Sequence, residues 1–195
     1  MSDFLSTMIK NAVAKYNNAA TPTAYNSSLG RSEDCTVTAP NAAWSISFTL
    51  DEKGRDELEH KARQHFSNVK KTDSRLGSYG GIHSMRKQDD GSVMYTARKK
   101  CMTAKGKQNP EPKIVDGKKF PVENRDFWGG SKINLMVTLL PTNSPASGDW
   151  GISILLDAIQ VVAPVYGSDE REDFDVISDQ GVTAASEFED EIPFG

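Results

Sequence analysis

The chain has 195 residues and a formal net charge of −4, and 37% of its residues are hydrophobic. This length suits one domain with appendages. No apolar run approaches the ~20 residues that cross a bilayer, so no membrane partner is expected. The first residues, MSDFLSTMIKNAVAKY, lack the basic and apolar regions of a secretory signal. Cys35 and Cys101 are the only cysteines and do not have metal-site spacing, so a reducing cytoplasm is expected.

The two parts of the chain carry opposite charge. Residues 166–195 contain ten acids and one base, a net charge of −9. Residues 1–165 contain 22 bases and 17 acids, a net charge of +5. The sequence therefore predicts a basic body followed by a disordered acidic tail.

The first residues have the spacing of an amphipathic helix. Apolar residues recur at intervals of three and four over residues 2–16, at Phe4, Leu5, Met8, Ile9, Ala12, Val13 and Tyr16. A polar stretch with Pro22 follows. We therefore expect an N-terminal helix and linker over residues 1–28.

The middle of the chain has mostly period-two patterns. The segment AWSISFTL places Trp44, Ile46 and Phe48 on one face and serines on the other, which predicts a strand. Three further strands are expected in SVMYTARKKCM, SKINLMVTLLP and WGISILLDAIQVV, and the last two should form a hairpin. KIVDGKKF has Asp-Gly between extended flanks, which indicates another hairpin. The charged segment over residues 52–68 reads as a surface helix, with Leu58, Ala62 and Phe66 on one stripe.

This order of elements favours a mainly β fold. We expect an OB-fold-like barrel of five to six strands, closed or partly open, with one inserted helix, in residues 29–165. Residues 166–195 would form the acidic tail. An immunoglobulin-like sandwich is the main rival architecture, but it seldom carries a long charged helix in mid-chain.

Catalytic and metal-binding patterns are weak. His60 and His65 are five residues apart, which does not suit one helical face, and there is no Gly-rich phosphate loop. Asp116, Glu123 and Asp126 could form a nuclease metal cluster, but Asp116 fits better as a turn residue. We therefore expect no enzyme activity, no catalytic residue, no metal and no cofactor. A metal-dependent nuclease or recombination enzyme stays open as a less favoured alternative, as does a non-enzymatic scaffolding protein.

Residues 98–125 combine many bases with aromatic neighbours. Nine bases face three acids in this segment, a net charge of +6. Basic groups follow phosphates, and aromatic rings stack on bases of any identity, so the combination suits single-stranded nucleic acid. The predicted phosphate contacts are Arg98, Lys99, Lys100, Lys105, Lys107, Lys118, Lys119 and Arg125. The predicted stacking residues are Tyr79, Tyr95, Phe120, Trp128 and Trp150. Phe127 and Trp128 are adjacent, so in an extended segment one should be buried and the other free.

The same residues resemble those of a known family. YTARKK, the insertion at 101–125, FWGG and AIQVV are similar to the C-terminal half of bacteriophage single-stranded DNA-binding proteins, with a likeness over roughly residues 30–165. The ending EDEIPF resembles the tail of bacterial single-stranded DNA-binding proteins, although here Gly195 follows Phe194.

This resemblance implies an OB fold and a non-enzymatic protein of the infected host's cytoplasm. It implies that the protein coats single strands during replication, recombination and repair, and that many members are homodimers. It also implies tail contacts to a polymerase, helicase or primase. The tail residues that carry the likeness are Glu189, Asp190, Glu191, Ile192, Pro193 and Phe194.

Overall fold

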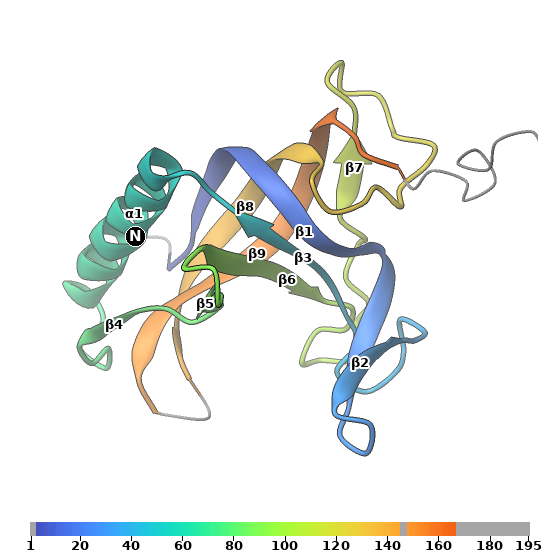
Figure 1. Ribbon diagram of the computed structural model, residues 1–195. Coiled ribbons are helices and arrows are strands. Elements are labelled where there is room, and N and C mark those ends of the chain that lie inside the picture. The colour runs from blue at the N-terminus through green and yellow to red at the C-terminus, as the bar shows by residue number, and fades with distance from the viewer. Residues whose placement is uncertain (1–2, 145–147, 167–195) are drawn as a thin grey trace, which may run out of the picture.

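The computed structural model describes residues 3–144 and 148–166, and most of them form strands (Figure 1). The long strands are β1 (Leu5–Asn26), β3 (Ala43–Thr49), β6 (Val93–Lys100), β8 (Lys132–Asn143) and β9 (Trp150–Ala163). Short strands are β2 (Arg31–Asp34), β4 (Tyr79–Ile82), β5 (Met85–Lys87) and β7 (Lys113–Val115). The helix α1 (Glu52–Lys70) lies between β3 and β4 in the chain. It is drawn to the left of the strands in Figure 1, and β7 to the upper right.

The five long strands close into a barrel. β1 pairs with β3 on one edge and with β8 on the other, β3 pairs with β6, and β8 pairs with β9, all antiparallel. A parallel pairing of β6 with β9, at Arg98 and Leu155, completes the ring. The ring order β1-β3-β6-β9-β8 is that of a five-stranded OB-type barrel. The predicted mainly β, OB-fold-like barrel with an inserted helix is confirmed.

The predicted N-terminal helix over residues 2–16 is wrong, because residues 5–26 form β1. The register of β1 shifts against β8 between Ile9 and Ala12, and against β3 between Ala14 and Tyr16. Each bulge adds a residue that breaks the period of two. Asn11, at the first bulge, has a left-handed φ of 56°. The first bulge places the buried Ile9 and Ala12 three residues apart, and the exposed Phe4, Met8 and Tyr16 add apolar residues on the outer face, so that together they imitate a helix.

The same strand changes the expected division of the chain. Because β1 is hydrogen-bonded to both β3 and β8, it belongs to the barrel rather than to an appended segment. Its last residues, Thr23–Asn26, pair with β2 to form a hairpin that extends away from the barrel (Figure 1). The acidic tail predicted for residues 166–195 lies, apart from Tyr166, outside the described residues.

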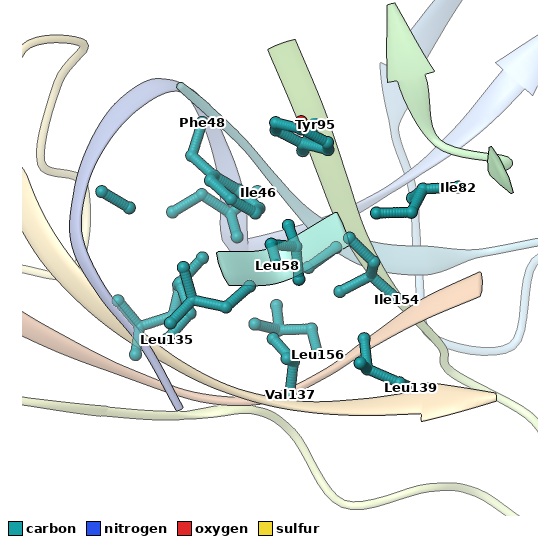
Figure 2. Close-up of a cluster of buried hydrophobic side chains, with 14 of the residues drawn as sticks. Ile46, Phe48, Leu58, Ile82, Tyr95, Leu135, Val137, Leu139, Ile154 and Leu156 are labelled. Carbon is teal, nitrogen blue, oxygen red and sulfur yellow. The ribbon is translucent and has the colours of Figure 1, made fainter. Parts of the chain in front are cut away.

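The core lies inside the barrel and under α1. Alternate residues of β3 and β8 point inward, among them Ile46, Phe48 and Leu135 (Figure 2). The helix adds Leu58, Ala62, Phe66 and Val69, all buried, from one stripe. Asp51 begins α1 as its N-cap, accepting a hydrogen bond of 2.7 Å from the backbone N–H of Gly54. The helix predicted for residues 52–68 is therefore confirmed.

The two predicted hairpins also form. β8 and β9 pair along their whole length, from Lys132 with Ala163 to Asn143 with Trp150. In the KIVDGKKF segment, Asp116 N–H donates to the carbonyl oxygen of Phe120 at 2.8 Å, and Val122 N–H donates to that of Ile114 at 3.1 Å. The Asp-Gly pair therefore starts a tight reversal after β7.

The adjacent aromatic residues Phe127 and Trp128 point in opposite directions, as the sequence predicts. Phe127 is 1% exposed and belongs to the core, whereas Trp128 is 58% exposed. The Asn17 side-chain amide donates to the carbonyl oxygens of Arg125 and Phe127, at 3.0 and 3.2 Å. These bonds hold the segment against β1.

This contrast predicts different costs for the same truncation at neighbouring positions. Phe127→Ala should lower the free energy of unfolding by about 3–5 kcal/mol, because a buried ring leaves a cavity. Trp128→Ala should change it by less than about 0.5 kcal/mol, because the ring faces solvent. Denaturant unfolding of both variants measures this, and equal losses would contradict the assignment of Phe127 to the core.

Candidate nucleic-acid interface

The outer surface of β3 and β6 is a floor of small hydroxyl side chains. Ser45 and Ser47 alternate with buried residues of β3, and Thr96 alternates with buried residues of β6, so all three point outward. The hydroxyls of Ser47 and Thr96 hydrogen-bond across the strands at 2.9 Å. This floor is polar and uncharged, and it offers both donors and acceptors.

Charged and aromatic side chains stand around this floor. Arg98 pairs with Ser45 and is exposed, and its guanidinium donates to the backbone oxygen of Asn41 at 3.0 Å. Tyr16 of β1 pairs with Ser47 and is 64% exposed. We name the surface formed by Tyr16, Ser45, Ser47, Thr96 and Arg98 the β1–β3–β6 face.

The segment FWGG meets β1 beside this face. Gly130 N–H donates to the carbonyl oxygen of Ala14 at 2.8 Å, and Ala14 N–H donates to that of Ser131 at 2.9 Å. A Cβ at Gly129 would lie 2.9 Å from the carbonyl oxygen of Lys15, so only glycine allows this approach. The Trp128 side chain therefore begins next to the β1 bulge that contains Lys15 and Tyr16.

The basic segment 98–125 does not form one compact patch. It runs from the end of β6 through a turn, in which Met102 bridges to Gln108, then along β9 as β7 and around the reversal at Asp116. Arg98 and Lys100 point outward from β6, and Lys99 is half-buried. Lys105 and Lys107 lie exposed in the turn, and Lys118 and Lys119 lie exposed at the reversal.

One predicted phosphate contact, Arg125, has an acidic partner. The Arg125 guanidinium forms an ion pair of 3.1 Å with Glu111 and also donates to the backbone oxygen of Pro112. These bonds join the end of the insertion to its middle. Among the described residues, no other predicted phosphate contact has an acidic partner within 4 Å.

The five predicted stacking residues have different environments. Tyr95 is 4% exposed and its ring stacks on Phe48 at 5.8 Å, so the prediction that Tyr95 stacks on a base is wrong. Tyr95 lies on the face of β6 that points into the barrel. Tyr79 is half-buried between Phe66 and the guanidinium of Arg63, which lies 5.2 Å from its ring centre. Burial also raises the pKa of its phenol.

The remaining candidates differ in exposure. Trp150 is half-buried and packs closely against Gly77, where a Cβ would lie 2.7 Å from the indole. Phe120 is 65% exposed and Trp128 is 58% exposed. Of the predicted stacking residues, these two present open rings.

Tyr16 and Lys15 were missed by the sequence prediction. Their positions became part of the expected N-terminal helix, because the bulges concealed the period of a strand. Reading residues 5–26 as a strand with two bulges would have placed Tyr16 beside the serines of β3.

Residues that could hold a metal ion do not gather in the described parts of the chain. Within residues 3–144 and 148–166, no group of three or more His, Cys, Asp or Glu side chains is close enough for a metal site. Asp116 is a turn residue, as the sequence favours. In the same residues, no helix is long and apolar enough to cross a membrane.

Sequence comparisons identify no relative, whereas structural comparisons identify proteins that share the fold. No model of a protein family matches the sequence, and no curated protein matches it. A single-stranded DNA-binding protein from bacteriophage Enc34, truncated at its C-terminus, superposes with a TM-score of 0.56 and 10% identity. That match covers 84% of this chain and 88% of the Enc34 chain.

Two further structures give similar values. The Enc34 protein in complex with single-stranded DNA has a TM-score of 0.56 and 10% identity, covering 81% of this chain and 86% of that one. Gp2.5, a single-stranded DNA-binding protein encoded by bacteriophage T7, has a TM-score of 0.54 and 15% identity, covering 93% of this chain and 98% of gp2.5. The protein therefore shares the fold of bacteriophage single-stranded DNA-binding proteins over most of its length.

Proposed function

We propose that the protein binds single-stranded DNA, without strong sequence preference, on the β1–β3–β6 face. The observation that carries this proposal is the pair of open rings, Tyr16 and Trp128, beside the bulge of β1, with Arg98, which has no acidic partner among the described residues, across β3 on the same face. In OB folds, ligands bind on the second and third strands of the barrel, which are β3 and β6 here. The shared fold with proteins that bind single-stranded DNA supports the same assignment.

The chemistry of the face explains a sequence-tolerant contact. Aromatic rings stack on any base, because every base has a π-face. Phosphates interact with the cations at the rim, and hydroxyls of the floor can donate to phosphate or sugar oxygens. The Ser and Thr side chains of the floor can both donate and accept, so they impose no fixed pattern on a base edge.

The roles proposed for individual residues follow their positions. Arg98 and Lys100 would contact phosphates at the β1–β3–β6 face, Lys99 would do so from the other side of β6, and Lys105 and Lys107 at the adjoining turn. Lys118 and Lys119 would contact phosphates at the reversal after β7, and Arg125 would do so while it holds Glu111. Trp128 and Phe120 would stack on bases, and Tyr16 joins them. Tyr79 lies between Phe66 and Arg63, and Trp150 packs against Gly77, so these half-buried rings would offer only part of their surface.

The acidic tail is proposed to compete with DNA and to bind partner proteins. Its first residues follow Val165, whose carbonyl oxygen accepts a hydrogen bond of 2.7 Å from Trp128 N–H. The tail therefore starts beside the open rings, and a tethered polyanion of net charge −9 has a high effective concentration there. Bound DNA would displace it and free residues 189–194 for a polymerase, helicase or primase. This sequence of events would act in phage DNA replication, recombination and repair within the infected cell.

The stacking role predicts that Trp128→Ala weakens binding of oligo-dT by about 1–3 kcal/mol, the usual value of one stacked base. Trp128→Phe should keep most of the affinity, because a ring remains. Fluorescence titration provides the measurement: Trp44 is buried and Trp150 is half-buried, so quenching by DNA should come mainly from Trp128 and should fall strongly in both variants. Full quenching without Trp128 would contradict its contact with DNA.

The phosphate role of Arg98 predicts a change in salt dependence. Arg98→Gln should reduce the slope of log K against log salt by about 0.7, the contribution of one phosphate on a single strand. Arg98→Lys keeps the charge and should keep the slope. An unchanged slope in Arg98→Gln would show that this guanidinium serves only its bond to Asn41.

Tail competition predicts that deletion of residues 167–195 raises the affinity for an unstructured oligonucleotide at low salt. The gain should shrink as salt rises, because screening weakens the tail's attraction to the face. Adding the tail as a separate peptide should lower the affinity of the shortened protein, and a peptide with its acids replaced by Gln and Asn should not. An affinity that does not rise on deletion would rule out the competition.

A further inference from the structure

The reversal that follows β7 is a rigid tip built around Asp116. The Asp116 Oδ1 atom accepts two backbone hydrogen bonds of 2.8 Å, from the N–H groups of Lys118 and Phe120. Lys119 N–H donates to the backbone oxygen of Asp116 at 3.0 Å, and Asp116 N–H donates to that of Phe120 at 2.8 Å. One side chain therefore fixes the conformation of the four residues that follow it.

A chain of amide side chains ties this tip to the barrel. Gln160 of β9 donates to the backbone oxygens of Asp116 and Gly117, at 3.4 and 3.3 Å. Its own Oε1 accepts from Asn134 of β8 at 2.9 Å, and Asn134 Oδ1 accepts from the N–H of Asn11 at 3.0 Å. The tip is thus connected across β9 and β8 to the first bulge of β1.

The tip presents two cations and one open ring. Lys118 and Lys119 are exposed and have no acidic partner within 4 Å among the described residues, and Phe120 is 65% exposed. Lys119 has a φ of 70°, in the left-handed region that a side chain disfavours. A strained lysine and an exposed phenylalanine contribute nothing to the core, so this conformation is typical of a contact site rather than of a passive turn.

The tip lies in line with the β1–β3–β6 face but at a distance from it. β6 and β7 pair in succession with the same edge of β9, since Arg98 pairs with Leu155 and Val115 with Gln160. Five strand positions separate these pairs, which is about 17 Å at ~3.3 Å per residue. The exposed Lys113, opposite Ala158, lies between them. The cations of β6, β7 and the tip therefore form an extended track.

We infer that this tip, residues 116–120, is a second and preorganised contact for the same single strand, and that Asp116 and Gln160 are its positioning residues. The inference rests on the proposed function. The track consists of cations and ends in an open ring. It therefore matches a polymer that has one negative charge and one stackable ring per nucleotide. A strand long enough to span from the face to the tip gains the second contact, and a short strand does not.

Oligonucleotide length and a matched pair of variants test this inference. Affinities are measured for oligo-dT of about 5 and about 16 nucleotides, near the two ends of the site-size range of one OB fold. Phe120→Ala should weaken binding of the long strand about tenfold, the value of about 1.4 kcal/mol for one stacked ring, and leave the short strand unchanged. Thermal unfolding checks that the variants are folded.

Asp116→Ala and Asp116→Asn separate positioning from charge. Both remove the same negative charge, but only Asn keeps an oxygen acceptor for the N–H groups of Lys118 and Phe120. Asp116→Ala should lose the long-strand gain as Phe120→Ala does, whereas Asp116→Asn should stay within about twofold of the wild type. Gln160→Leu should fall between them, because the turn remains but loses its anchor.

Several outcomes would overturn the inference. Equal losses in Asp116→Ala and Asp116→Asn would refute the positioning role, and equal losses of Phe120→Ala on both strand lengths would refute a separate second contact. If Phe120→Ala raises the affinity for DNA in the full chain and has no effect after deletion of residues 167–195, the tip holds the acidic tail rather than DNA. Failure of the wild type to bind either strand would refute the proposed function itself.

Discussion

The bulged course of β1 is the constraint on which the rest of the structure depends. This strand pairs with β3 on one edge and β8 on the other, so it must bend to let the ring close. Its bulges after Ile9 and Ala14 increase the local twist and provide that bend. The second bulge also leaves Lys15 outside the pairing and turns Tyr16 outward beside Ser47. Closure of the barrel and exposure of a ring on its binding face are therefore two results of one irregularity.

The FWGG segment fits this bulge as a unit. Phe127 fills the core, Trp128 stands in solvent, and Gly129 allows the close approach to Lys15. Gly130, with a φ of 93°, turns the chain so that Ser131 can pair with Ala14. Alternation of the extended chain sets the opposite directions of Phe127 and Trp128, and the turn at Gly129 and Gly130 brings the chain to β1. The backbone hydrogen bonds that join this segment to Ala14 of β1 also fix the position of Trp128.

Most of the fold could be predicted because its strands alternate cleanly. β3 and β8 each carry an apolar face with period two, and α1 has a stripe with intervals of three and four. The first strand could not be recognised, since its bulges and its exposed apolar residues together give helical spacing. Tyr16 was therefore not predicted as a surface residue of the barrel. Among the aromatic residues, pattern alone gave the opposed directions of Phe127 and Trp128. Deciding which is buried required the position of β1, and the burial of Tyr95 required knowing the inner face of β6.

The charge of the segment 98–125 shows why composition alone describes the candidate site incompletely. Its nine bases suggest a single patch, yet the barrel distributes them along β6, a turn, β7 and the tip. Arg125 closes the insertion through Glu111 instead of standing free. What unites the others is the edge of β9, to which β6 and β7 are hydrogen-bonded one after the other. Along this edge the pairing register places the cations at set intervals, and the tip end of the track has the open ring of Phe120. The register of β9 thus sets the spacing of these cations, although β9 itself contributes little charge.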